Sequence, residues 1–430
     1  MPNNLASNFT RKLARVFLEK FDSERVMSKN VDTQLLAGKF APDTGDTVDF
    51  KRPTDYTTVR TSNGDVSGET KSPIITGKAS GVVQDYFTAF VDYDEADEAI
   101  KLDQLDQLLA PMATRIKTDL ELDFAKFMMH NSGLLAGTVG TAADTWDDIA
   151  EAGAMLQASG VPSDAPWFYT VNPFTQRALA STNRSLGAGG SAGGLVKQAV
   201  DKATISEMFA GFDRVMTATT LASLTIGSEA DRAGTLSGTP TVTYVAAKDT
   251  MTQVLAVTAV GAGSTVIKAG ETVTITAASG AINRLNLSTR QLMLDEAGAA
   301  ILWTGVVTTE VTLTGGAGNV TVTGPAIFES GGAYNTVSQS PLSGDIITFS
   351  AAANAVLQPN LFWHKQAFSI GSVPIKKLHS TDTLATTEDG LQFRVSRGVG
   401  FLENEQKVRI DFRPAYGVMN PFFAGHGWGS

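Results

Sequence analysis

Cysteine is absent from this chain of 430 residues, and only four residues are histidine. Disulfides, thiolate catalysis and cysteine-based metal sites are therefore excluded. No apolar run reaches the roughly 18 residues that a membrane-spanning helix needs, so we expect no contact with a membrane. Positive charge is also scarce, because 34 Lys and Arg face 44 Asp and Glu, for a net charge of −10. Such a chain is not built to wrap nucleic acid electrostatically.

Motifs of the common enzyme classes are missing as well. The four histidines, His130, His364, His379 and His426, form neither H-E-x-x-H nor an i,i+4 pair. Residues 187–192 fit the spacing G-x-G-x-x-A, but no strand pattern precedes them, which favours a flexible linker. There is no G-x-x-x-x-G-K-[ST] and no G-x-S-x-G. We therefore predict a protein that is not an enzyme and that uses no cofactor or metal.

A block rich in Thr and Gly and poor in charge fills residues 222–345. It alternates β-branched and other residues, as in 241–245, 271–276 and 319–323, and glycine turns separate these runs. Alternation with closely spaced turns is typical of a small all-β sandwich or barrel. Because the flanks have a different composition, the pattern predicts a β-module inserted at one surface point of a host domain.

The flanks mix helices and strands. Apolar residues recur every four positions from Met112 to Met128, which predicts a helix over 111–132 of about 33 Å at about 1.5 Å per residue, with Pro111 at its first position. Acidic residues 92–98 precede it and complement a helix N-terminus. They do not form a calcium loop, because Asp97 stands where the turn needs glycine and Asp103 replaces the bidentate glutamate. Helices and strands alternate over 146–215, and strands are expected at 362–370, 391–396 and 407–412.

Several collinear segments on both flanks resemble the major capsid (coat) proteins of short-tailed double-stranded DNA bacteriophages, the Hong Kong 97-type members with an inserted β-barrel domain. In the N-terminal half these are residues 1–5, 31–38, 45–53, 98–111 and 127–129, and in the C-terminal half 358–362, 378–380 and 413–416. The resemblance implies an α+β fold of the Hong Kong 97 type, with an inserted all-β domain. Its parts would be an N-terminal arm (1–36), an extended projecting loop with flanking strands (37–93), a spine helix and peripheral domain (94–140), an axial domain (141–221 and 346–385), the inserted domain (222–345) and a peripheral β ribbon with the C-terminus (386–430).

The resemblance also implies a function. The protein would be a major capsid protein that self-assembles as hexamers and pentamers into an icosahedral procapsid around scaffolding protein, in the bacterial host cytoplasm. The shell would enclose the packaged double-stranded DNA through non-specific contacts and become part of the virion. Portal protein would be a further partner, and a decoration protein stays open.

Two sets of residues are candidates for contacts between subunits. Loop cations could dock onto carboxylates near the long helix of the next subunit, or simply be solvated; the cations are Lys51, Arg52, Arg60, Lys71 and Lys78, and the carboxylates are Glu95, Asp97, Asp103 and Asp106. In the N-terminal helix an apolar stripe lies beside a basic side; the stripe is Phe9, Leu13, Phe17 and Phe21. Such a stripe packs on its own domain or docks on a partner. We predict that it meets scaffolding protein or an adjacent subunit.

Two other classes of protein remain open at this point. A phage tail or surface β-structural protein would explain the Thr/Gly block, but it predicts a repetitive β pattern throughout instead of a long helix. A hydrolase with an accessory β-module would need a clustered nucleophile and base, and the sequence shows none.

Overall fold

The computed structural model describes residues 5–23, 25–37, 46–52, 54–69, 73–94, 105–186, 199–261, 263–277, 280–400 and 405–430. The chain forms two compact units. The first comprises Met1–Asp49, Ser80–Ala125 and Phe368–Gly417, and the second comprises Phe50–Ala79, Lys126–Ala367 and Val418–Ser430. Each unit has its own sheets and buried side chains, and each is described by itself.

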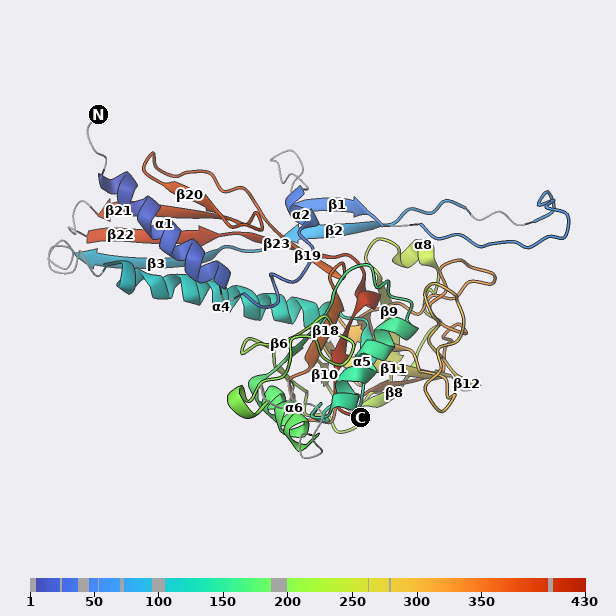
Figure 1. Ribbon diagram of the computed structural model, residues 1–430. Helices are drawn as coiled ribbons and strands as arrows, with labels where there is room; N and C mark the ends of the chain where they lie inside the picture. The colour runs from blue at the N-terminus through green and yellow to red at the C-terminus, as the bar shows by residue number, and fades with distance from the viewer. Residues whose placement is uncertain are drawn as a thin grey trace. The chain divides into compact units, whose positions relative to one another are not determined.

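In the first unit, a four-stranded antiparallel sheet packs against a helix. The strand order is β20 (Thr383–Thr386), β21 (Gln392–Gly400), β22 (Glu405–Phe412) and β3 (Phe87–Asp94). Alternate residues of β21 and β22, such as Phe393 and Ile410, are buried. Helix α1 (Leu5–Ser23) crosses this sheet (Figure 1). The predicted strands at 391–396 and 407–412 are thus confirmed.

A second sheet, mainly in the first unit, has the order β1 (Thr47–Lys51), β2 (Lys78–Val83), β23 (Pro414–Val418) and β19 (Phe368–Ser372). The short helix α2 (Gln34–Ala37) packs on β19. Leu35 of α2 is fully buried there. A Cβ added at Gly371 would lie 2.8 Å from the Leu35 Cβ. The glycine is therefore required for this close approach of helix and strand.

Helix α4 (Leu105–Asn131) is the predicted long helix. It begins six residues earlier than predicted, so Pro111 lies inside it and not at its first position. The apolar stripe is buried as expected; its members are Met112, Ile116, Leu120, Phe124 and Met128. In the first unit, the buried Glu121 carboxylate accepts hydrogen bonds from the backbone N–H groups of Met27 (2.8 Å) and Ser28 (3.1 Å). These bonds hold the segment after α1 against the helix.

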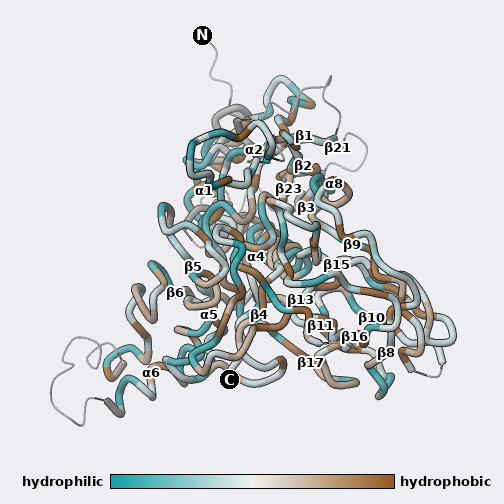
Figure 2. Tube along the Cα trace, turned by 90° about the vertical axis from the view of Figure 1, so that its right-hand side faces the viewer, coloured by the Kyte–Doolittle hydropathy of each residue, from teal (hydrophilic) through white to brown (hydrophobic). Residues whose placement is uncertain are grey.

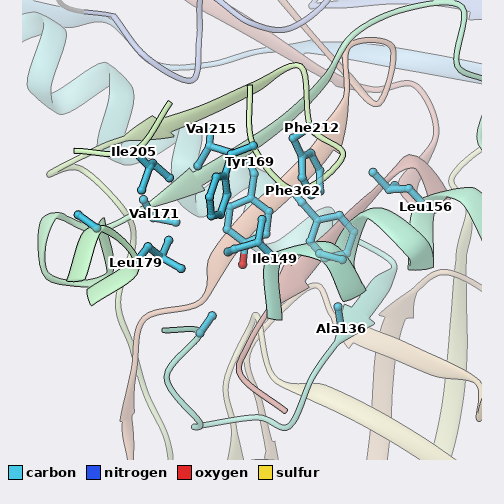
Figure 3. Close-up of a cluster of buried hydrophobic side chains, with 14 of the residues drawn as sticks. Ala136, Ile149, Leu156, Tyr169, Val171, Leu179, Ile205, Phe212, Val215 and Phe362 are labelled. Atoms are coloured by element: carbon cyan, nitrogen blue, oxygen red, sulfur yellow. The ribbon is translucent and has the colours of Figure 1, made fainter. Parts of the chain in front are cut away.

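The second unit contains a five-stranded mixed sheet. Its order is β4 (Leu134–Ala136), β24 (Ala424–Gly427), β18 (Asn360–His364), β5 (Trp167–Val171) and β6 (Arg214–Thr217). Helices α5 (Trp146–Ala158) and α6 (Pro173–Leu186) accompany it. Figure 3 shows its core, in which Tyr169 and Phe362 stack with centroids 6.3 Å apart and Ile149 and Leu156 approach from α5. Thr145 and Asp148 form a capping box at the start of α5.

The inserted module is a closed six-stranded antiparallel barrel. The order is β11 (Thr272–Ala277), β13 (Thr304–Val307), β15 (Gly318–Thr323), β9 (Thr252–Thr258), β8 (Ala233–Leu236) and β16 (Ile346–Phe349), and β16 pairs back onto β11. Apolar stretches (brown in Figure 2) run along β9, β11 and β13. Trp303 is fully buried in the core and its Nε1 donates to the Gly324 carbonyl at 3.0 Å. Closure removes the unpaired edges that an open sheet would carry.

Smaller elements complete the module and its attachment. They are the strand β12 (Gly280–Ala281), the ribbon of β10 (Thr265–Ile267) and β14 (Val311–Leu313), and the short helix α8 (Tyr244–Ala247). The chain enters the module at β7 (Leu224–Thr225) and leaves it at β17 (Val356–Leu357), and these two strands pair antiparallel. The predicted insertion at one point of the host is therefore confirmed. A 3-10 turn (Pro421–Phe423) precedes β24.

Four predicted boundaries are wrong. Residues 126–140 do not belong with the predicted peripheral domain, because they lie in the second unit, where β4 is a strand of the five-stranded sheet. The module does not end at residue 345, because β16 begins at Ile346 and closes the barrel. Residues 368–385 do not belong with the second unit, since β19 and β20 lie in the first. Residues 418–430 do not belong with the β ribbon, because β24 is an inner strand of the five-stranded sheet.

Candidate assembly surfaces

The apolar stripe of α1 faces its own subunit. Phe17 and Phe21 are buried, with ring centroids 4.8 Å and 4.6 Å from Phe393 of β21. Leu13 is buried in the same way. Docking of these residues on a partner is therefore the wrong prediction, because burial in the subunit already uses their surface. The Phe9 side chain lies outside the described part of the chain.

The opposite side of α1 carries the exposed residues Arg11, Lys12, Arg15, Glu19 and Lys20. Four of these five residues are cations, so this face is basic on a chain whose net charge is −10. Arg11 and Arg15 thus present positive charge to solvent on this basic face.

Arg52, predicted to be a docking cation, is buried at the base of the loop between β1 and β2. Its guanidinium donates to three backbone carbonyls, those of Lys78 (3.1 Å), Val418 (3.3 Å) and Met419. Burial lowers the pKa of Arg52 to about 10, while Tyr244 and Asp249 oppose that shift. The group is still charged at neutral pH and fastens the loop base to the C-terminal segment. The prediction of a free contact cation is wrong here.

The other predicted loop cations are either exposed or outside the described residues. Lys51 and Arg60 are exposed, and so is Lys78, whose backbone N–H donates to an Asp249 carboxylate oxygen at 3.2 Å. Lys71 lies outside the described residues. The same holds for the carboxylates Glu95, Asp97 and Asp103, and of Asp106 only the backbone, at the start of α4, is described. The predicted pairing of loop and helix charges stays a prediction.

Both arms of the loop are seated on the inserted barrel of the same chain. Asp55 forms an ion pair with Arg290, and its backbone N–H donates to the Tyr334 hydroxyl at 3.0 Å. That hydroxyl in turn donates to the Ile75 carbonyl at 3.4 Å. Tyr334 stacks flat on Tyr244 of α8, with centroids 3.7 Å apart. No sequence signal connects these residues, because Asp55 and Arg290 are 235 positions apart.

A fully buried arginine joins the barrel to the end of α4. The Nη2 group of Arg284 donates to the Gly133 carbonyl at 2.9 Å and to Thr304 at 2.8 Å. Burial lowers the pKa of Arg284 to about 10, so it remains charged at neutral pH. Nearby in the same unit, burial lowers the pKa of His426 to about 4, although the Met129 carbonyl, 2.8 Å from Nε2, opposes the shift. His426 is thus neutral and structural.

Among the described residues, no group of three or more His, Cys, Asp and Glu side chains is placed to hold a metal ion. None of the helices in the described segments is both long enough and apolar enough to cross a membrane.

A search of protein families matches residues 5–429 of the chain to the family described as P22 coat protein, gene protein 5. The major capsid protein of Acyrthosiphon pisum secondary endosymbiont phage 1 is 34% identical over 434 residues, which cover 100% of both chains. The chain belongs to the P22 coat protein family. This coat protein is a structural component of the virion capsid and not an enzyme.

The family assignment confirms the resemblance seen in the sequence. It also decides against a tail protein and against a hydrolase with an accessory module. The predicted α+β fold with an inserted all-β domain is confirmed, since the host units mix helices and strands and the insert is a closed barrel.

Solved structures with similar folds come from other phages. One is from Mycobacterium phage Che8, with a TM-score of 0.46, 11% identity, and coverage of 94% of this chain and 90% of that chain. The capsid of cyanophage P-SCSP1u follows with a TM-score of 0.40, 11% identity and coverage of 90% and 84%. The capsid of Ralstonia phage GP4 has a TM-score of 0.40, 10% identity and coverage of 93% and 87%.

Proposed function

We propose that this coat protein assembles as hexamers and pentamers into an icosahedral procapsid around scaffolding protein, in the cytoplasm of a bacterial host. The shell then encloses the packaged double-stranded DNA, and portal protein is a further partner. The observation that carries this proposal is the match of nearly the whole chain, residues 5–429, to a coat protein family. The closed barrel inserted through the paired strands β7 and β17 supports it, because such a module can add contacts without disturbing its host.

The barrel, in this proposal, both supports folding and contacts neighbouring subunits. Its core is separate from that of the five-stranded sheet, with Trp303 and Val320 among the buried members of the first and Tyr169 and Phe362 among those of the second. A core of its own lets a module form early and template its surroundings.

Contacts between subunits, we propose, include charges at the base of the loop. Lys51 and Lys78 are exposed there, at the ends of adjacent strands β1 and β2. Their proposed partners are carboxylates of the next subunit, namely Glu95, Asp97, Asp103 and Asp106. An exposed pair contributes only about 0–1 kcal/mol, but every subunit repeats it. Charge reversal at Lys51 should slow assembly and leave the unfolding midpoint of the free subunit nearly unchanged.

The basic face of α1 is the proposed contact for scaffolding protein or an adjacent subunit. Because its cations are solvent-exposed, the contact should weaken as salt rises and screening shortens the range of the charges. Binding of the subunit to immobilised scaffolding protein at several salt concentrations tests this. Arg15→Glu should weaken binding, and Lys365→Glu, which makes the same change of charge at an exposed position of the second unit, is the charge-matched control.

Contact with the packaged DNA should be weak and independent of sequence. The net charge of −10 repels phosphate overall. Filter binding at physiological salt should therefore show little retention of duplex DNA, whatever its sequence. Tight retention of one particular sequence would contradict this part of the proposal.

Electron microscopy of the expressed protein, with and without its scaffolding protein, tests the whole proposal. Closed shells or rings of five and six subunits are expected. Fibres, or compact monomers in both preparations, would overturn it.

A further inference from the structure

The barrel carries an exposed apolar face that the proposed contacts do not use. Three short segments form a small antiparallel sheet outside the barrel strands, through the bridges Leu285 to Leu292, Leu294 to Ala300 and Asn283 to Leu302. Side chains at paired positions, and at positions two apart, point to the same side of a sheet. Leu292, Leu294 and Leu302 therefore share one face.

All three leucines are open to solvent, at 42%, 52% and 39% of their full surface. Met293, between two of them, points the other way and is buried. The turn that follows is acidic. Asp295 is committed to that turn, because its carboxylate accepts from the N–H groups of Ala297 (2.9 Å) and Ala299 (2.7 Å). Glu296 is exposed and makes no ion pair with any described residue.

The tip of the loop between β1 and β2 has the complementary character. Val59 and Val66 are 43% and 52% exposed, and Arg60 beside them is exposed and has no ion pair with a described residue. The turn between the two valines holds its own shape: the Asn63 side chain accepts from the Asp65 N–H (3.1 Å), and the Asp65 side chain accepts from the Ser67 N–H (2.9 Å). A preformed tip loses less conformational entropy on binding.

We propose that the loop tip of one subunit docks on the leucine face of another copy of this chain, with Val59 and Val66 against the leucines and Arg60 against Glu296. Within one chain, Asp55 fastens the loop to Arg290, which lies between the paired residues Leu285 and Leu292, and yet both surfaces stay uncovered. A second copy can cover both. Charge favours this occupant over a second leucine face, because two such faces would bring two Glu296 side chains together.

The contact is heterologous, since each subunit donates a tip and accepts one. Repeated heterologous contacts do not stop at a dimer, and they form rings where the rotation between subunits closes. The patch is small, so a single contact is weak and forms only where many subunits assemble. This inference rests on the proposed assembly of the coat protein and adds the receptor surface for its loop.

Disulfide trapping tests the contact directly, because the chain has no cysteine of its own. Shells of the double variant Val59→Cys with Leu294→Cys should give a ladder of covalent oligomers on oxidation and non-reducing electrophoresis. The two single variants serve as controls and should stay monomeric. Dimers from Leu294→Cys alone would mean that leucine faces meet each other, and a crosslink within one chain would mean that the loop covers its own barrel. Either result, or shells without any crosslink, overturns the proposal.

Charge exchange gives a second measurement that needs no crosslink. Arg60→Glu should raise the critical concentration for assembly roughly threefold to fivefold. Adding Glu296→Arg should restore it, and Glu310→Arg, another exposed acid of the barrel, should not. Impaired assembly that Glu296→Arg fails to rescue overturns the pairing. If the unsubstituted chain forms no shells at all, the proposed assembly has failed instead.

Discussion

Replacing Phe21 by alanine tests whether α1 belongs to the fold or to an interface. Phe21 is completely buried, and its ring lies 4.6 Å from Phe393, 6.0 Å from Phe412 and 5.6 Å from Phe17. Truncating a buried phenylalanine costs about 3–5 kcal/mol, because apolar burial is lost and a cavity remains. At a helix that can settle onto the sheet we expect the lower part, about 3–4 kcal/mol. The ratio of folded to unfolded subunit should then fall roughly 100- to 1,000-fold.

The two units can be followed separately in this experiment. All five tryptophans lie in the second unit, so their fluorescence in urea reports on that unit alone. Amide hydrogen exchange in α1, β21 and β22 reports on the first. Phe21→Ala should lower the free energy of opening measured by amide exchange in these three elements by the whole expected loss of about 3–4 kcal/mol. Arg15→Ala, on the exposed face of the same helix, should change stability by less than about 0.5 kcal/mol.

A different outcome would refute the burial argument. If Phe21→Ala left the protection of β21 and β22 unchanged and only impaired assembly, the stripe would be acting on a partner. The reasoning from ring contacts would then have failed, and the docking role predicted from the sequence would return.

Three further predictions concern other parts of the chain. Burial would raise the pKa of the Asp411 carboxyl, but hydrogen bonds from Arg409, Arg394 and Thr88 outweigh burial and lower this pKa. The ionised carboxylate therefore stabilises the fold above about pH 4, and this stability is lost on acidification. Asp411→Asn should accordingly reduce the fall of the thermal midpoint below pH 4. Gly371→Ala should destabilise the first unit by about 1–3 kcal/mol, measured by urea denaturation, because its methyl group would press on the buried leucine of α2. Gly398→Ala, which meets nothing within 4 Å, should not. Residues 222–357 expressed alone should unfold cooperatively and give dispersed amide signals in NMR spectra, whereas 222–345 should not, because it lacks β16.

The sequence was most informative where a pattern is local. Strict alternation marked the inserted module, and the spacing from Met112 to Met128 marked α4. The predicted end at residue 345 omits the whole of β16 (Ile346–Phe349), because Ser343, Gly344 and Asp345 form a polar turn that resembles an exit from a domain. The strand after that turn is only four residues long. Its assignment depends on two pairings, with β8 and with β11, that join residues far apart in the chain.

The wrong prediction for the loop cation Arg52 also arises from contacts between residues far apart in the chain. A cation in a polar loop is solvated unless something distant desolvates it, and the carbonyls that surround Arg52 include Val418 and Met419, which follow it by more than 360 positions. The aromatic stripe of α1 had two admissible partners, its own sheet or a neighbour, and only the position of Phe393 decides between them. Composition can show that a surface is apolar or charged, but not which segment covers it.

The loop unites both kinds of information. The sequence predicts the long polar stretch of the loop and the strands at each end. It does not predict the attachment of the loop to the barrel through Asp55, Arg290 and Tyr334. That attachment has a consequence for assembly. A loop fixed at its base to the module explores less space, so its tip is presented in a narrower range of directions and binds at a lower entropic cost. The proposed contact includes neither Asp55 nor Arg290, yet breaking their ion pair should weaken capture of the tip, because the loop would then explore more directions.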